Sequence, residues 1–72
     1  MGAQMVSSLI GEAMLGAGLT LDERAVISLR YGLYGGEGNS QEWIGAILSI
    51  SVDSVNRLEA QGLRKLRRWN DT

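Results

Sequence analysis

The stretch SQEWIGAILSISVDSVNRLEAQGLRKLR, from Ser40 to Arg67, contains two apolar helical patterns separated by a short interruption. The first pattern begins directly after Ser40, a residue type that caps helix N-termini, and it gathers its apolar side chains on one face. The run SIS at residues 49–51 breaks this period, and Ser51 can cap a second, longer and more polar helix. A short helix, a turn of about three residues and a longer helix form the outline of a helix-turn-helix.

Another helix is predicted upstream, between Thr20 and Gly32. Thr20 and Glu23 match the S/T-x-x-E capping box, in which each side chain satisfies a backbone amide of the other residue. Gly32 is a natural helix terminator, since glycine adopts the left-handed conformation without strain. The following glycine-rich run YGGEGN, residues 34–39, predicts a turn, and neither a Walker lysine nor a Rossmann strand accompanies it to suggest phosphate binding.

The N-terminal segment, residues 1–18, is predicted to form an apolar helix, and residues 19–72 the remainder of a single compact domain. Apolar residues recur at helical spacing in this segment, and Glu12 is its only charge. So apolar a helix requires a covering surface. That surface is either the rest of the domain or a partner, and a second copy of the chain is one possible partner. Fraying of the helix in isolation is the alternative.

Composition disfavours several classes of protein. The 72-residue chain has neither cysteine nor histidine, which removes thiolate metal sites and the commonest general base, and its carboxylates are scattered. We therefore expect a protein that is not an enzyme, with no catalytic residues, no metal and no cofactor. Apolar runs are too short to cross a bilayer and a signal peptide is missing, so we expect a cytoplasmic protein without a membrane partner.

Charge is divided unevenly along the chain. Residues 1–56 carry six acids against two arginines, whereas residues 57–72 carry five basic residues against two acids. A basic C-terminal helix can bind phosphate even in an acidic protein, because exposed charges act over short distances at ordinary salt. The basic residues expected to hold DNA phosphates are Arg64, Lys65, Arg67 and Arg68. Cations near a helix C-terminus also interact favourably with its dipole, which is the alternative explanation.

The start of the last helix would enter the major groove of DNA if this is a helix-turn-helix. Asn56 can pair with adenine and Arg57 with guanine. Asp53 can accept from cytosine, and Val52 can touch a thymine methyl group. Alternatively, these residues are only the polar outer face of an amphipathic helix. The candidate base-reading set is Ser51, Val52, Asp53, Ser54, Asn56 and Arg57.

The runs LTLDERAVISLRYGL and SQEWIGAILSISVDSVNRLEAQGLRKLR together resemble region 4 of the sigma factors of bacterial RNA polymerase. The resemblance extends from Leu19 to Arg68, and its ends, LRYGL and EAQGLRKLR, are specific. It implies an all-α, four-helix domain with a C-terminal helix-turn-helix. Such a domain docks on the β flap of the polymerase core, contacts the minus-thirty-five promoter element and also meets activators or anti-sigma proteins. The candidate partner contacts are Leu9, Met14, Val26, Ile27, Arg30, Tyr31 and Trp43.

Several positions depart from the sigma pattern. Asp22 stands where the pattern has a phosphate-binding arginine, and the recognition helix loses two arginines and gains only Arg57. Ser49 replaces a turn glycine, and Gly62 replaces an alanine at a cost of about 1 kcal/mol in helix propensity. Trp43 replaces a glutamate, either extending the core or forming an exposed anchor for another protein.

From these features we expect a sigma region 4-like module that binds RNA polymerase and contacts promoter DNA in transcription initiation. It would be bacterial or phage-borne and located with the nucleoid when bound to polymerase. The alternative is a sigma-like interaction protein or decoy that binds polymerase or a regulator without specific DNA recognition. A self-associating helical domain is a third possibility, resting on the apolar N-terminal segment alone.

Overall fold

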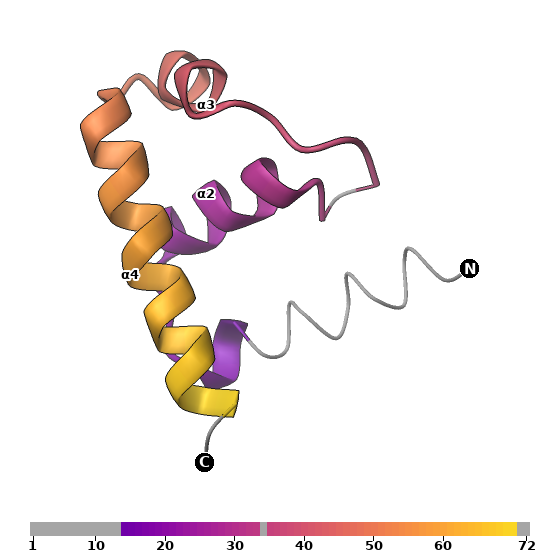
Figure 1. The fold of residues 1–72 in the computed structure, drawn as a ribbon, viewed down its shortest axis with the longest axis vertical. Coiled ribbons are helices and arrows are strands. Elements are labelled where there is room, and N and C mark those ends of the chain that lie inside the picture. Colours follow the sequence, from indigo (N-terminus) through magenta and orange to yellow (C-terminus); the bar gives the residue numbers. More distant parts are fainter. Residues whose placement is uncertain (1–13, 34, 71–72) are drawn as a thin grey trace.

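The computed structural model describes residues 14–33 and 35–70, and every regular element in these ranges is helical (Figure 1). The helices are α2 (Leu21–Tyr31), α3 (Gln41–Leu48) and α4 (Val52–Asn70). Residues 14–16 are also helical, and this short turn lies near the C-terminal end of α4. The all-α prediction is therefore confirmed, whereas most of the helix expected in residues 1–18 falls outside the described residues.

Helix α2 begins and ends where its local signals indicate. Thr20 Oγ1 accepts a hydrogen bond from the Glu23 backbone N–H at 3.1 Å, and Glu23 Oε1 accepts one from the Thr20 N–H at 2.9 Å. This reciprocal pair confirms the predicted capping box. At the other end Gly32 is left-handed, with a φ of 67°, and a Cβ atom there would collide with the carbonyl oxygen of Gly36.

The turn between α3 and α4 is formed by residues that hydrogen-bond locally. The Ser40 hydroxyl accepts from the Trp43 N–H at 3.1 Å and caps α3. The Ser51 hydroxyl accepts from the Ser54 N–H at 3.0 Å at the start of α4. Between them Ser49 has a φ of 58° and a ψ of 43°, a conformation that strains any residue with a side chain. Both predicted caps are confirmed.

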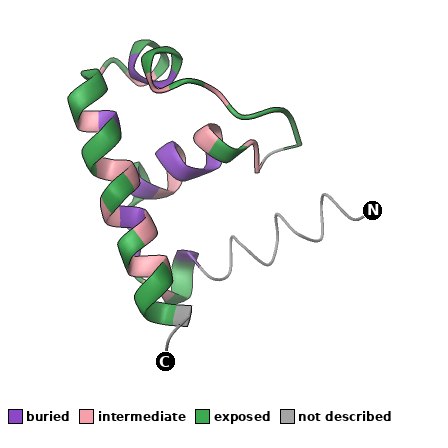
Figure 2. Cartoon of the chain, in the orientation of Figure 1, coloured by how far each residue is buried: buried purple, intermediate pink, exposed green. Residues whose placement is uncertain are grey.

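Two groups of buried side chains hold the helices together (Figure 2). The turn cluster joins α2, α3 and the first half of α4. It consists of Val26, Ile44 and Val55, with Leu29, Leu48, Ile50 and Leu58 packed around them. The N-terminal cluster joins the first described residues to α2 and the second half of α4. It consists of Met14, Leu19 and Ile27, with Ala17, Leu33, Leu63 and Leu66 around them.

Gly62 lies where α4 passes closest to the N-terminal cluster, and it is buried. A Cβ atom at this position would lie 3.0 Å from Ile27 Cγ1, 3.1 Å from Ile27 Cδ1 and 3.3 Å from Leu19 Cδ2. These separations are shorter than ordinary carbon–carbon contacts of about 3.5–4.0 Å. The expected cost in helix propensity is therefore accompanied by a packing gain, because glycine lets α4 approach α2 more closely.

Candidate nucleic-acid interface

The first half of α4 presents a continuous exposed stripe, which we call the α4 stripe. Its residues are spaced i, i+1, i+4, i+5 and i+8, so they share one helix face, while Val55 and Leu58 face the turn cluster. Of the predicted base-reading residues, Ser51 lies just before this helix and is exposed, and Ser54 is half-buried. The α4 stripe consists of Val52, Asp53, Asn56, Arg57 and Ala60.

The second half of α4 carries the predicted phosphate contacts, and they fall into two groups. Arg64, Arg67 and Arg68 are exposed and continue along the helix from the α4 stripe. Lys65 instead turns towards α2, where its Nζ lies 2.7 Å from Glu23 Oε1 and 3.4 Å from the carbonyl oxygen of Gly18. An acceptor within the protein therefore already engages the charge of Lys65, and its contact with phosphate stays a prediction.

Glu23 is 3% exposed, so the ion pair with Lys65 is buried on the carboxylate side. Burial is the largest influence and by itself raises the pKa of Glu23. It is outweighed by the hydrogen bond from Lys65, the hydrogen bonds from Thr20 and the Lys65 charge, which together lower this pKa below its ordinary value of 4.5. Glu23 thus serves both the α2 cap and the attachment of α4.

Glu59, a residue that the sequence analysis did not single out, organises a second polar group. Its Oε2 accepts from the Tyr31 hydroxyl at 2.8 Å, and its Oε1 lies 3.0 Å from Gln41 Nε2 and 3.4 Å from Arg30 Nε. The hydrogen bond that Tyr31 donates to this carboxylate, together with burial, raises the pKa of the phenol. Gln41 Nε2 also lies 3.3 Å from Asn56 Oδ1, so the network reaches the α4 stripe.

The sequence does distinguish Gln41 from the sigma pattern, which has Thr-Leu-Glu-Glu at the start of this helix: Gln41 stands in place of the leucine, as Trp43 stands in place of the second glutamate. The contacts of Gln41 with Glu59 and Asn56 join residues 18 and 15 positions apart, however, and local patterns do not predict such pairs.

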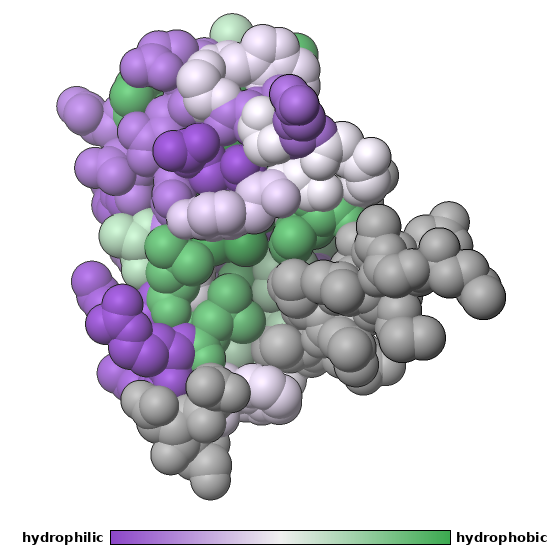
Figure 3. Space-filling model, turned by 45° about the vertical axis from the view of Figure 1, so that its right-hand side comes forward, coloured by the Kyte–Doolittle hydropathy of each residue, from purple (hydrophilic) through white to green (hydrophobic). Residues whose placement is uncertain are grey.

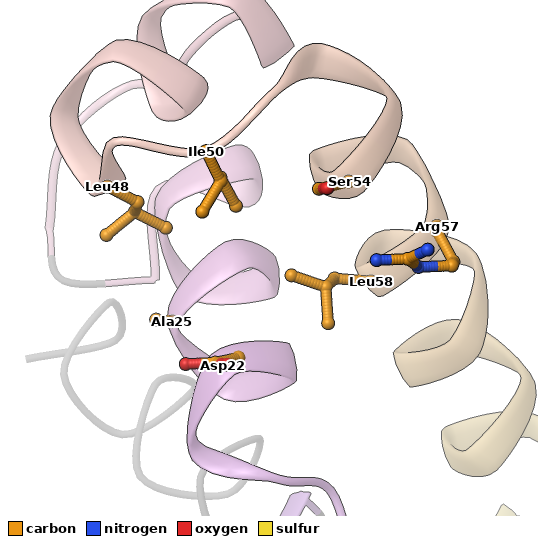
Figure 4. A pocket seen from close by; sticks show the side chains of 7 residues that line it. All are labelled: Asp22, Ala25, Leu48, Ile50, Ser54, Arg57 and Leu58. Carbon is orange, nitrogen blue, oxygen red and sulfur yellow. The ribbon is translucent and has the colours of Figure 1, made fainter.

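A cavity of about 260 Å³ opens between α2, the turn and the first half of α4 (Figure 4). Asp22 and Ala25 line it from α2, Leu48 from the end of α3 and Ile50 from the turn. On the α4 side the lining residues are Ser54, Arg57 and Leu58. Asp22 therefore borders the same hollow as Arg57, which places a carboxylate beside the helix expected to approach DNA.

The predicted partner contacts need a correction. Met14, Val26 and Ile27 are 5%, 0% and 2% exposed, because they form the two core clusters, and they offer a partner no surface in the folded domain. Arg30 and Tyr31 serve the Glu59 network, although the Tyr31 side chain remains exposed. Leu9 lies outside the described residues.

Trp43 does not extend the core. It is 45% exposed, and Ile47, one helical turn further on, is 57% exposed. The two side chains therefore form an apolar face on α3. The hydrophobic surface that Figure 3 shows between two hydrophilic regions is a different one, because it lies at mid-height in that view, below the level of α3 in Figure 1.

Among the residues that the structure describes, no group of acidic side chains has the arrangement of a metal site. The same part of the chain contains no helix that is long and apolar enough to span a membrane.

A short helix and a longer helix joined at a tight turn, with polar and cationic side chains exposed along the longer one, define a helix-turn-helix domain of the DNA-binding class. The family model for sigma-70, region 4, matches residues 17–68. The chain belongs to this family of transcription-initiation domains, which bind rather than catalyse. The resemblance inferred from the sequence is thereby confirmed.

Curated relatives agree with this assignment. RNA polymerase sigma factor SigA1 of Synechococcus elongatus is 36% identical over 69 residues, which is 93% of this chain and 17% of that protein. SigA of a Nostoc species is 44% identical over 48 residues, 67% of this chain and 12% of the relative. The probable sigma-C factor of a Synechocystis species is 45% identical over 49 residues, 68% of this chain and 12% of the relative. The chain thus spans less than a fifth of each relative, and no solved structure matches it significantly.

Proposed function

We propose that this chain is a promoter-contacting module that lays α4 in the major groove of DNA and docks on the β flap of the RNA polymerase core. The observation that carries the DNA-binding part is the continuity of the α4 stripe with three exposed arginines, Arg64, Arg67 and Arg68. Base-reading and phosphate-holding side chains then lie along one helix, as a recognition helix requires. The module would work in the bacterial cytoplasm, without turnover.

Its promoter preference should differ from that of the usual sigma pattern. Each bidentate contact between an arginine and a guanine contributes about 1 to 3 kcal/mol of discrimination, and two arginines of the pattern are replaced by Ser54 and Asn56. Asp22 adds repulsion of phosphate near Arg57. We therefore expect α4 to select a sequence other than the usual minus-thirty-five element, and to do so weakly.

Binding of pooled random duplexes at low salt, followed by sequencing of the bound fraction, tests the DNA-binding part. We expect one short motif to be enriched. When Arg57 is changed to alanine, the base preference at one position of that motif should disappear. In a salt titration, Arg64→Ala should reduce the slope of log K against log salt by about 0.9, the contribution of one phosphate contact. The matched control is Lys65→Met in the Glu23→Gln background, because the two paired charges are then removed together and the slope should stay unchanged.

A second candidate function is that of an interaction protein or decoy that binds polymerase, an activator or an anti-sigma protein without reading DNA. Asp22 and the exposed apolar face of Trp43 and Ile47 favour it. An apolar interaction should change little with salt, whereas DNA binding should weaken steeply. Capture of the polymerase core by the domain, together with failure to enrich any DNA motif, would support the decoy and exclude the promoter-contacting module.

A further inference from the structure

The orientation of the Asn56 side-chain amide can be worked out from the Glu59 network. Glu59 is 12% exposed in its side chain, and donors from α2 and α3 surround it. An ionised carboxylate only accepts hydrogen bonds, so each neighbouring atom must be a donor. The atom of Gln41 that lies 3.0 Å from Glu59 Oε1 is therefore its amide nitrogen, Nε2.

The Asn56 amide is oriented in turn by Gln41. Gln41 Nε2 carries two hydrogens and lies 3.3 Å from the side-chain amide of Asn56. Because an amide nitrogen donates and does not accept, the Asn56 atom that faces it must be the oxygen, Oδ1. The Asn56 carbonyl is thus turned towards α3, and its Nδ2 group is directed away from Gln41.

We propose that Gln41 is a positioning residue that determines which base Asn56 prefers. This inference rests on the proposed function, in which α4 lies in the major groove. An unconstrained asparagine pairs with adenine by accepting from N6 and donating to N7 at once. Oδ1 keeps a second lone pair, but the carbonyl is turned towards Gln41, so the Nδ2 side of the Asn56 amide, with its two N–H donors, is the side directed away from α3. Asn56 therefore favours a base edge that offers acceptors, namely guanine with O6 and N7 or thymine with O4.

The chain of contacts from Glu59 through Gln41 to Asn56, which we call the relay, is specific to this chain and is not part of the sigma pattern. The pattern has leucine in place of Gln41 and arginine in place of Asn56, so neither the donor nor the amide that it orients is present there. The adenine preference expected for Asn56 from the sequence is replaced by a preference for guanine or thymine. Glu59 supports the relay by fixing Gln41, and it does not itself contact a base.

Selection from random duplexes with three proteins tests the proposal. The wild type should enrich guanine or thymine at one position of its motif, and Asn56→Ala should lose the preference at that position alone. Gln41→Met keeps the length of the side chain and removes the donor, so adenine should gain by about fivefold or more at the same position. Adenine preferred by the wild type, or an unchanged preference in Gln41→Met, would overturn the relay.

Side-chain amide exchange in the free protein separates the relay from the proposed function. The Gln41 Nε2 hydrogens should exchange with water more slowly than those of Asn56 Nδ2, because the former are bonded to Glu59 and Asn56. Slower exchange at Asn56 than at Gln41 would refute the orientation whether or not DNA binds. If no variant binds any duplex, the proposed function fails and the base preference fails with it.

Discussion

Replacing Lys65 with methionine isolates the charge that joins α4 to the start of α2. Methionine keeps most of the apolar stem and removes the ammonium group, so Glu23 loses a partner at 2.7 Å while remaining 3% exposed. Breaking a fully buried ion pair costs about 3 to 5 kcal/mol. Lys65 is 37% exposed and Glu23 keeps the Thr20 amide, so we expect a smaller loss of about 2 kcal/mol in unfolding free energy.

Thermal unfolding followed by circular dichroism measures this loss. In a domain of this size, about 2 kcal/mol lowers the melting temperature by about 8 to 16 °C. The matched control is Glu23→Gln, because glutamine also completes a capping box and carries no charge. In that background Lys65→Met should cost less than about 0.5 kcal/mol, the usual range for a surface substitution.

The cost should also depend on pH. The folded-state pKa of Glu23 lies below its ordinary value of 4.5, so its contribution to stability is complete above that value and is lost as the pH falls through the lowered folded-state pKa. Without Lys65, burial is opposed by Thr20 alone and this pKa is less depressed. The cost of Lys65→Met should therefore be largest at neutral pH and shrink in acid. An equal cost at pH 7 and pH 3, or one that is undiminished in the Glu23→Gln background, would refute this account of the ion pair.

Three other substitutions test the fold and the surface. Ser49→Gly should stabilise the domain by about 1 kcal/mol in urea unfolding, because the left-handed conformation strains serine and not glycine; a loss of stability would contradict this. Helix propensity alone predicts that Gly62→Ala raises the unfolding free energy by about 1 kcal/mol, but we expect a smaller change because the added Cβ would crowd Ile27. An increase of the full ~1 kcal/mol would show that the core relaxes freely. Trp43→Gln should change the unfolding free energy by less than about 0.5 kcal/mol, because Trp43 is exposed. If α3 is a docking face, the same substitution should weaken binding of the domain to the polymerase core, and unchanged binding would exclude Trp43 from docking.

The residues at which the helices begin could be predicted, because each capping side chain bonds a backbone amide only three positions further on. The capping box of Thr20 and Glu23 and the serine caps of α3 and α4 are contacts of this kind, and the structure contains all of them. The helix-turn-helix followed from these helix starts and from apolar periodicity.

Burial and long-range pairing were less predictable. Periodicity places Val26 and Ile27 on an apolar face but does not say whether the domain or a partner covers it, so they were mistaken for partner contacts. Lys65 and Glu23 are 42 positions apart, and only the crossing of α4 over α2 brings them together. The role of Gln41 depends likewise on the approach of two helices, and side-chain spacing along one helix carries no information about it.

The division of the core into two clusters has a consequence for how the domain opens. Helix α4 has 19 residues, so it is about 28 Å long, and the turn cluster holds its first half while the N-terminal cluster holds its second. We therefore expect each half of α4 to detach from the core while the other half stays packed, in two separate opening reactions. Backbone amides near Leu63 and Leu66 should then lose protection together with those near Leu19, while the amides beside Val55 stay protected. The first half of α4, which carries the base-reading residues, would then stay helical and packed while the second half opens. The second half carries Arg64, Arg67 and Arg68.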